Sequence, residues 1–182
     1  MLFSYLNAAW PGEGHDETAF RFVSEASQAA RRRMAPALYG GFTGVGWAIT
    51  HLEGRLLDSG GGDPAAAIDA ALLKYLARTP WRDHYDLIGG LVGYGVYGLE
   101  RLPRESGHGL LERVIDRLAE TAESLPEGVT WFTAPDLLPD RQRLLCPRGY
   151  YNLGLAHGVP GVIALLGSAC AEGIREDGAR PG

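Results

Sequence analysis

One glycine-rich apolar motif occurs three times in this sequence and constrains its fold more than any other feature. Each copy opens with Gly-x-x-Gly and runs into an apolar tail, beginning at Gly41, Gly90 and Gly158. A glycine inside a helix costs about 1 kcal/mol relative to alanine. At a helix start it is tolerable, because it lets backbones approach closely and leaves amide groups open to a ligand. The motifs therefore predict three related helix starts, which serve either packing or ligand contact.

Segments of a second kind alternate with these motifs. Apolar residues at helical spacing predict one-sided helices over 18–33, after Asp63-Pro64, and over 110–125. Asp16 is the expected N-cap of the first, and Pro126 is expected to end the third. By contrast, residues 40–52, 89–102 and 153–166 are apolar on all sides, which is typical of buried helices. The alternation predicts an all-α fold with an outer layer of amphipathic helices around an inner, buried layer.

The longer second gap between motifs indicates a loop. Residues 130–149 contain Pro135, Pro139 and Pro147, which disfavour regular structure there. No segment is a convincing strand, and the best candidate, residues 129–133, is short.

Composition excludes several function classes. The net charge of −5 gives no basic face for nucleic acid, and residues 31–33, an arginine run, are expected to form the last turn of a helix. The N-terminus lacks the Lys or Arg of a signal peptide, and no apolar run is long enough to cross a bilayer. We expect a cytoplasmic protein. No Cys-x-x-Cys or His-x-x-x-His pair forms a self-contained metal site, and Cys170, in an apolar run, is expected to be a buried, inert thiol.

Three polar residues stand close to the motifs. His157 directly precedes Gly158, where an imidazole can act as a general acid or base, or can be a core histidine bonded to a carbonyl. Asp86 can orient such an imidazole, bind substrate, or cap a helix beginning near Leu87. Asn152 is expected either to cap a helix or to belong to the functional site. The other histidines lie in less persuasive surroundings: His15, His51, His84 and His108.

The segment 149–161, Gly-Tyr-Tyr-Asn-Leu-Gly-Leu-Ala-His-Gly-Val-Pro-Gly, closely resembles the signature of lanthionine synthetase C-like proteins. Residues 39–48 and 85–93 are similar to earlier repeats of that family, and the resemblance runs from about residue 1 to residue 166. It implies an α/α toroid of inner and outer helices.

The resemblance also implies a chemistry. Bacterial members of the family cyclise lanthipeptide precursors by adding a cysteine thiol to dehydroalanine or dehydrobutyrine. It implies that His157 takes the thiol proton or protonates the enolate, and that Asp86 assists it as a second catalytic residue. We also expect Asn152 and Tyr151 to contact the substrate. In the family, a zinc ion held by two cysteines and a histidine presents the thiolate. The implied partners are the precursor peptide and a dehydratase.

The sequence departs from the family where zinc should bind. The zinc ligands of the family lie in Trp-Cys-x-Gly and Cys-His-Gly motifs, which do not occur here, and Cys146 and Cys170 stand in other contexts. We therefore expect residues 1–182 to form a partial domain, an incomplete ring of about three helical hairpins with a polar tail from about residue 172. Such a chain would be a fragment, a truncated frame or one piece of a split protein, with a missing C-terminal half as a partner. Alone, it is expected to bind no zinc and to be inactive.

Two other functions remain open from the sequence. A toroid of this kind can serve as a non-catalytic module that binds a peptide or glutathione. A toroidal glycoside hydrolase would need two carboxylates across a cleft, and only Asp86 has motif support.

Overall fold

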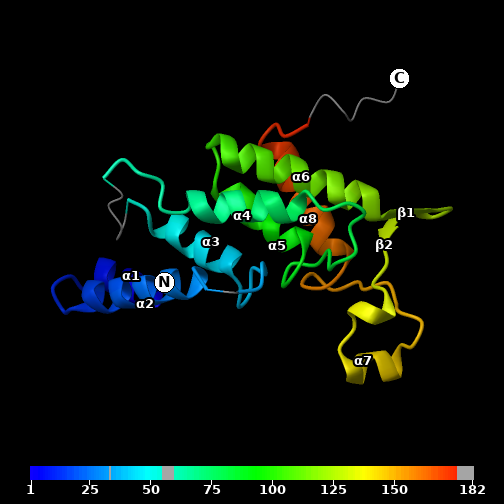
Figure 1. Cartoon of the computed structure of the whole chain (residues 1–182), viewed down its shortest axis with the longest axis horizontal. Coiled ribbons are helices and arrows are strands. Elements are labelled where there is room, and N and C mark those ends of the chain that lie inside the picture. Colours follow the sequence, from blue (N-terminus) through cyan, green and yellow to red (C-terminus); the bar gives the residue numbers. More distant parts are fainter. Residues whose placement is uncertain (33, 55–59, 176–182) are drawn as a thin grey trace.

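The computed structural model describes residues 1–32, 34–54 and 60–175, and helices dominate them (Figure 1). In this described part, no helix is long and apolar enough to cross a membrane. The elements in chain order are α1 (Leu2–Ala9), α2 (His15–Ala30), α3 (Phe42–Leu52), α4 (Ala66–Leu76), α5 (Leu91–Glu100), α6 (Glu105–Thr121), β1 (Ala122–Leu125), β2 (Gly128–Trp131), the 3-10 helix η1 (Pro135–Leu137), α7 (Asp140–Leu145) and α8 (Val159–Ala171).

The two predicted layers are present. The glycine-rich segments form α3, α5 and α8, and α5 lies between the other two, in contact with both. Helix α5 is the most enclosed, with Leu91, Tyr94 and Tyr97 fully buried. The amphipathic helices α4 and α6 each turn one apolar face onto this core, through fully or almost fully buried residues: Leu72, Leu76, Leu110, Leu111, Val114 and Leu118. Burial of these apolar faces is the main stabilising term of the fold.

Helix α8 is less buried than its sequence predicts. Its uncharged sequence is typical of a helix enclosed on all sides, yet Ile163 is 63% exposed. Cys170 is also exposed, so the prediction of a buried thiol is wrong. The physical reason is position, because in the described residues α8 packs against α5 on one side and has no further inner helix on the other.

Close backbone packing explains the Gly-x-x-Gly motifs. A Cβ atom built on Gly90 would stand 2.3 Å from the carbonyl oxygen of His84, and one on Gly158 would stand 2.0 Å from that of Asn152. The second glycine of each motif meets another carbonyl of the same loop in the same way. Real Cβ atoms do not approach so closely, so only glycine lets the preceding loop fold back onto each helix start. Of the two interpretations left open by the sequence, packing is the one these contacts support.

The predicted N-cap of the first amphipathic helix differs in the structure. Helix α2 begins at His15 with Gly14 as its N-cap, so Asp16 lies in the first turn and does not cap it. The same helix ends at Ala30, which leaves Arg31 as its C-cap, whereas Arg33 lies outside the described residues. Asp63 accepts a hydrogen bond from the backbone N–H of Ala65 at 3.1 Å, just before α4. Caps shift because several short polar side chains near a helix start compete for the same amides.

A β-hairpin replaces the predicted end of the third amphipathic helix. The apolar spacing predicts a helix to Leu125, but α6 ends at Thr121 and Ala122–Leu125 pairs antiparallel with Gly128–Trp131. The indole of Trp131 donates to the carbonyl of Leu118 at 2.9 Å, which fixes the hairpin to the end of α6. The two-residue turn at Pro126-Glu127 favours this pairing over a continued helix.

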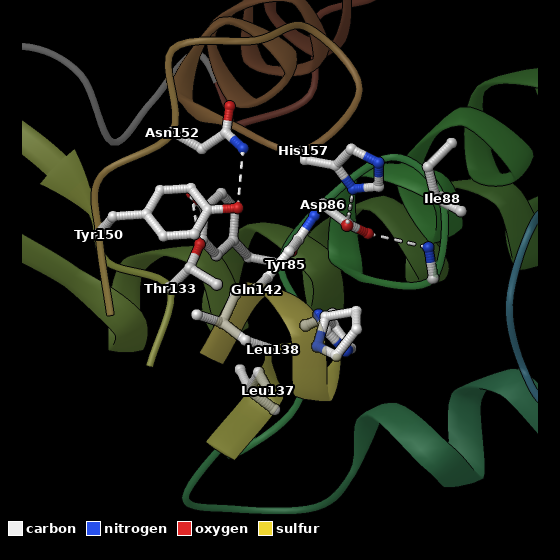
Figure 2. Close-up of a pocket in the computed structure, with 13 residues that line it drawn as sticks. Tyr85, Asp86, Ile88, Thr133, Leu137, Leu138, Gln142, Tyr150, Asn152 and His157 are labelled. Atoms are coloured by element: carbon white, nitrogen blue, oxygen red, sulfur yellow. Dashed lines mark hydrogen bonds and ion pairs between the residues drawn. The ribbon is translucent and has the colours of Figure 1, made fainter. Parts of the chain in front are cut away.

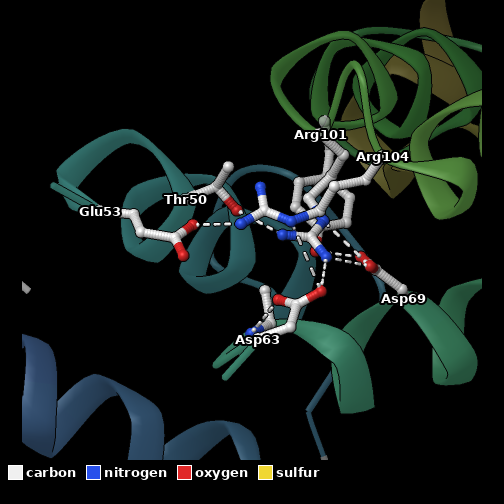
Figure 3. Close-up of polar contacts among 8 residues, drawn as sticks. Thr50, Glu53, Asp63, Asp69, Arg101 and Arg104 are labelled. Carbon is white, nitrogen blue, oxygen red and sulfur yellow. Dashed lines mark hydrogen bonds and ion pairs between the residues drawn. The ribbon is translucent and has the colours of Figure 1, made fainter. Parts of the chain in front are cut away.

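A buried ion cluster fastens an outer helix to an inner one (Figure 3). Arg101, at the C-terminal end of α5, is fully buried and donates to Asp69 of α4 through Nε at 2.9 Å. It also pairs with Asp63 in the loop before α4, and the hydroxyl of Tyr97 donates to Asp69 at 2.5 Å. Burial raises the pKa of Tyr97, and the bond to Asp69 raises it further, so this phenol stays a neutral donor. All the buried polar groups of the cluster thereby have partners.

The packing of α5 on α8 gives a first prediction. Replacing Gly95 with alanine places a Cβ atom 2.4 Å from the Leu165 side chain, so either this side chain or α8 must shift. We expect the free energy of unfolding to fall by about 1–3 kcal/mol, the usual cost of overpacking. Gly167→Ala is the matched control, because nothing lies within 4 Å of its Cβ position, and it should be neutral or stabilising by up to about 1 kcal/mol. Chemical denaturation measures both, and equal stability of the two variants would contradict the prediction.

Candidate functional site

A cavity of about 390 Å³ opens where the loops before α5 and α8 meet. Its third wall is an arm, residues 134–149, which contains η1 and α7 and projects from the helical layers (Figure 1). Backbone bonds between Thr133 and Tyr150, at 3.0 and 3.2 Å, close the base of this arm. The lining residues are His84, Tyr85, Asp86, Ile88, Gly89, Thr133, Leu137, Leu138, Pro139, Gln142, Tyr150, Asn152 and His157.

The structure brings His157 and Asp86 together at this cavity (Figure 2). Nδ1 of His157 lies 2.6 Å from Oδ2 of Asp86, whose other oxygen accepts a bond from the amide of Gly89 at 2.8 Å. The His157 side chain is 56% exposed, whereas that of Asp86 is 11% exposed. A backbone bond from Leu87 N to Ala156 O, at 3.0 Å, holds the two loops in register. The accessible imidazole of His157 is therefore held by a mostly buried carboxylate, which is itself fixed by the amide of Gly89.

This geometry decides which imidazole nitrogen can react. A carboxylate only accepts hydrogen bonds, so Nδ1 of His157 carries the proton that the pair shares. Nε2 has no hydrogen-bond partner in the part of the chain that the structure describes. A neutral imidazole in this tautomer presents Nε2 as a base, and after protonation the same atom is an acid.

Asp86 does not cap a helix beginning near Leu87. Helix α5 begins later, at Leu91, and Gly90 is its N-cap. Asp86 instead orders the turn before the helix through Gly89 while it meets the imidazole. One oxygen of the Asp86 carboxylate therefore fixes the turn before α5, and the other holds the imidazole of His157.

Of the two neighbouring tyrosines, Tyr150 lines the cavity and Tyr151 does not. The hydroxyl of Tyr151 donates to Glu123 at 2.8 Å, and this bond raises the pKa of Tyr151. Asn152 lines the cavity, with its amide donating to the Tyr150 hydroxyl at 3.3 Å and its Oδ1 accepting from Gly154 N at 2.7 Å. Neighbouring side chains in an extended segment point to opposite sides, so only one of the two tyrosines can face the cavity.

His84 was set aside in the sequence analysis, but His84 lines the same cavity. His84 precedes Gly90 at the same spacing as Asn152 precedes Gly158, and the carbonyls of both residues press on those glycines. Aligning the loops as well as the motifs would have found it. Tyr85 was also missed; its hydroxyl donates to the carbonyl of Trp131 at 3.2 Å, and burial raises its pKa.

Comparisons with known proteins identify the family and the fold of this chain. The family model described as "Lanthionine synthetase C-like protein" matches residues 1–180. The chain belongs to the lanthionine synthetase C-like family. No curated protein shows significant sequence similarity to it. Among solved structures, nisin cyclase superposes with a TM-score of 0.76 at 20% sequence identity, over 94% of this chain and 44% of that one.

The structural match establishes the fold of this family member. Nisin cyclase is an α/α toroid, and the present helices reproduce part of such a ring, which confirms the predicted incomplete toroid. The chain spans less than half the length of the nisin cyclase structure that it matches.

The zinc chemistry of the family has no ligand set within the described residues. No group of three or more His, Cys, Asp or Glu side chains there could hold a metal ion. Cys170 is exposed on α8, Cys146 follows α7, and neither lines the cavity of His157. The described residues therefore do not fit a zinc ion.

The remaining histidines lie outside the cavity in this family member. Nδ1 of His51 lies 3.0 Å from Glu100, and its Nε2 lies 2.6 Å from the hydroxyl of Tyr5. It also stacks on Trp47. His108 is exposed on α6. His84 and His157 are the two histidines in the cavity lining, and His157 is the one whose ring meets the carboxylate of Asp86.

Proposed function

We propose that this chain carries the proton-handling part of a lanthipeptide cyclase. The observation that carries the proposal is the contact between His157 and Asp86, at the mouth of a cavity in a member of this family. The substrate would be a precursor peptide whose dehydroalanine or dehydrobutyrine has been supplied by a dehydratase. The product would be a lanthionine or methyllanthionine thioether ring. A cytoplasmic location belongs to this proposal.

In the proposed reaction, the peptide sulfur bonds to the β-carbon of the alkene, and the π electrons move to the α-carbon to give an enolate. A proton must leave the thiol and another must reach the α-carbon, so no proton is gained or lost overall. Nε2 of His157 is the atom placed to transfer these protons, because Nδ1 is hydrogen-bonded to Asp86. We propose that His157 is the catalytic residue and Asp86 its positioning residue.

The cavity supports the same proposal through its polar lining. The Tyr150 hydroxyl and the Asn152 side chain lie in the same cavity as His157, where they can bind the amide groups of a peptide. Tyr151 is bonded to Glu123 outside the lining, so Tyr150 takes its place as the proposed substrate contact. The zinc-ligand motifs of the family would lie in polypeptide beyond these 182 residues, and we propose that the chain by itself is inactive.

The test uses a peptide with one cysteine and one dehydroalanine. Ring closure leaves the mass of the peptide unchanged but removes its alkylatable thiol, so alkylation followed by mass spectrometry counts rings. We expect ring formation above the protein-free rate when the chain is combined with the C-terminal half of a complete family member, and none above that rate with either half alone. If the peptide binds the combined halves without losing its thiol, the chain is a binding module and the cyclase proposal fails.

A further inference from the structure

The proposed reaction places negative charge on an oxygen atom that the site must stabilise. When the thiolate adds to the β-carbon, electrons pass through the α-carbon onto the carbonyl oxygen of the same dehydroalanine or dehydrobutyrine residue, which becomes an enolate oxygen. A hydrogen-bond donor fixed in advance at such an oxygen commonly lowers the barrier more than any other single contribution. Because His157 handles the proton at carbon, another group of the cavity must bind this oxygen.

The backbone amides at the start of an inner helix, the usual donors to an anion, are already engaged. The first three N–H groups of α5 donate to the carbonyls of residues 84–86, in the loop before the helix, at 3.3, 3.0 and 3.2 Å. In α8 the N–H of Val159 donates to the carbonyl of Asn152 at 3.0 Å, and the next residue, Pro160, has no N–H. The donor must therefore be sought among the side chains of the cavity.

Most polar side chains of the cavity are engaged as well. Asp86 only accepts hydrogen bonds, and the hydroxyl of Tyr85 donates to a backbone carbonyl at 3.2 Å. Asn152 is bonded through both ends of its amide, and the hydroxyl of Thr133 donates to that of Tyr85 at 3.4 Å. Three side chains of the lining keep donor hydrogens outside these bonds: His84, Tyr150 and Gln142.

Among these three, His84 has the position that is best fixed relative to the proton-transfer pair. It lies two residues before Asp86 in the same loop. Its N–H donates to Oδ1 of Asp83 at 2.9 Å, and its carbonyl accepts from the indole of Trp81 at 3.2 Å. Across the described residues neither ring nitrogen of His84 has a hydrogen-bond partner, and the residue is half-buried. A fixed backbone thus holds a donor whose hydrogen is available to a ligand.

The internal repeat favours the same residue. Ala35, His84 and Asn152 each stand six residues before the first glycine of a motif. In each copy the carbonyl of this residue accepts from the first N–H of the following helix, at 2.9, 3.3 and 3.0 Å, so the three positions are equivalent. The position carries a polar side chain in the two loops that border the cavity, and alanine in the loop that does not.

We propose that His84 is a second catalytic residue, whose imidazole N–H donates a hydrogen bond to the enolate oxygen. The sulfur bonds to the β-carbon, the π electrons of the alkene move to the α-carbon, and the negative charge is shared with the oxygen that His84 binds. When His157 protonates the α-carbon, the C=O bond forms again and His84 keeps its own proton. The inference rests on the proposed function, because the oxygen becomes charged only in that reaction.

The test compares two substitutions of His84 in the combined halves, with the peptide that has one cysteine and one dehydroalanine. Glutamine retains an N–H donor at this position, and alanine does not. We expect His84→Ala to lower kcat of ring formation about 10²–10³-fold, the usual loss for one oxyanion donor, with a nearly unchanged KM. His84→Gln should stay within about tenfold of the wild type and keep its pH profile, because glutamine does not titrate.

Three controls separate catalysis from effects on the fold or on binding. His108→Ala changes a histidine on α6 outside the cavity and should react as the wild type does. Tyr150→Phe removes a proposed peptide contact and should raise KM more than it lowers kcat. Both His84 variants should unfold at the denaturant concentration of the wild type, because the ring has no hydrogen bond to lose within the described residues.

Three results would overturn the role of His84: a wild-type kcat in His84→Ala, equal losses in His84→Ala and His84→Gln, or the large kcat loss in Tyr150→Phe instead. Failure of the proposed function looks different. It would appear as no ring formation by the wild-type halves, or as normal ring formation by His157→Asn. Slow reaction of His157→Asn together with a wild-type rate of His84→Ala contradicts only the inference about His84.

Discussion

Replacing His157 with asparagine is expected to lower the rate of ring formation about 10²–10⁴-fold, the usual contribution of a positioned general acid or base. Asparagine approximates the size of the ring and can still bond to Asp86, but it cannot carry a proton between the thiol and the α-carbon. The rate is measured as loss of alkylatable thiol with the combined halves. Deuterium uptake at the α-carbon in D₂O should fall in parallel, because His157 is the proposed proton donor.

The matched control is His108→Asn, which changes an exposed histidine on α6 that does not line the cavity. It should cyclise at the wild-type rate. Normal ring formation by His157→Asn would remove this residue from the mechanism and leave the family relationship and the fold unaffected.

Asp86→Asn separates positioning from proton transfer. An asparagine at this site can still accept from Gly89, but the amide nitrogen then faces Nδ1 as a donor. The imidazole must turn to the other tautomer, with the proton on Nε2, where it is no longer a base. We expect a slower rate and a changed pH profile of ring formation, with an intact fold. A variant that kept the wild-type profile would show that Asp86 does not act through His157.

The sequence predicted the inner helices well because the pattern that identifies each of them lies within the helix itself. Glycine spacing and the absence of charge over a dozen residues are enough to place α3, α5 and α8. The Gly-x-x-Gly motifs also predicted a close backbone approach, although not which backbone approaches. The prediction was wrong at residues 122–125, where apolar spacing is compatible with a helix and the turn at Pro126 favours a hairpin instead.

The site was only partly predictable. The resemblance placed Asp86 and His157 in the family motif, and the loop pairing that aligns them is a contact between segments far apart in the sequence. The third cavity wall comes from the arm, which carries Leu138 and Gln142 and has no repeat to reveal its position. Whether Tyr150 or Tyr151 faces the cavity depends on which side of an extended segment is turned inward. The sequence alone does not determine that orientation.

The largest loss of stability is expected from Asp69→Ala. This change leaves Arg101, which is fully buried, without its main partner, and leaves the hydroxyl of Tyr97 unpaired. Removing one partner of a buried ion pair costs about 3–5 kcal/mol, because the remaining charge keeps its desolvation penalty. Asp116→Ala is the control: Asp116 pairs with Arg175 at 2.7 Å on the surface, where such pairs contribute about 0–1 kcal/mol. Chemical denaturation measures both variants, and similar losses would show that the cluster does not hold α4 to α5.

The dependence on pH tests the same cluster through Asp63. Burial alone would raise the pKa of Asp63, but hydrogen bonds from Arg101 and from the amide of Ala65 outweigh it, so the pKa lies below its ordinary value. A carboxyl whose pKa is lower in the folded state stabilises the fold above its unfolded pKa of about 3.9, and this stabilisation is lost as the pH falls through the folded pKa. We therefore expect Asp63→Asn to be less stable than the wild type at pH 7 and the difference to shrink below about pH 4. If the stability difference between the two proteins stayed constant down to the lowest pH measured, the charge of Asp63 would not contribute to stability. The reason is that the attraction to the guanidinium of Arg101 requires an ionised carboxylate.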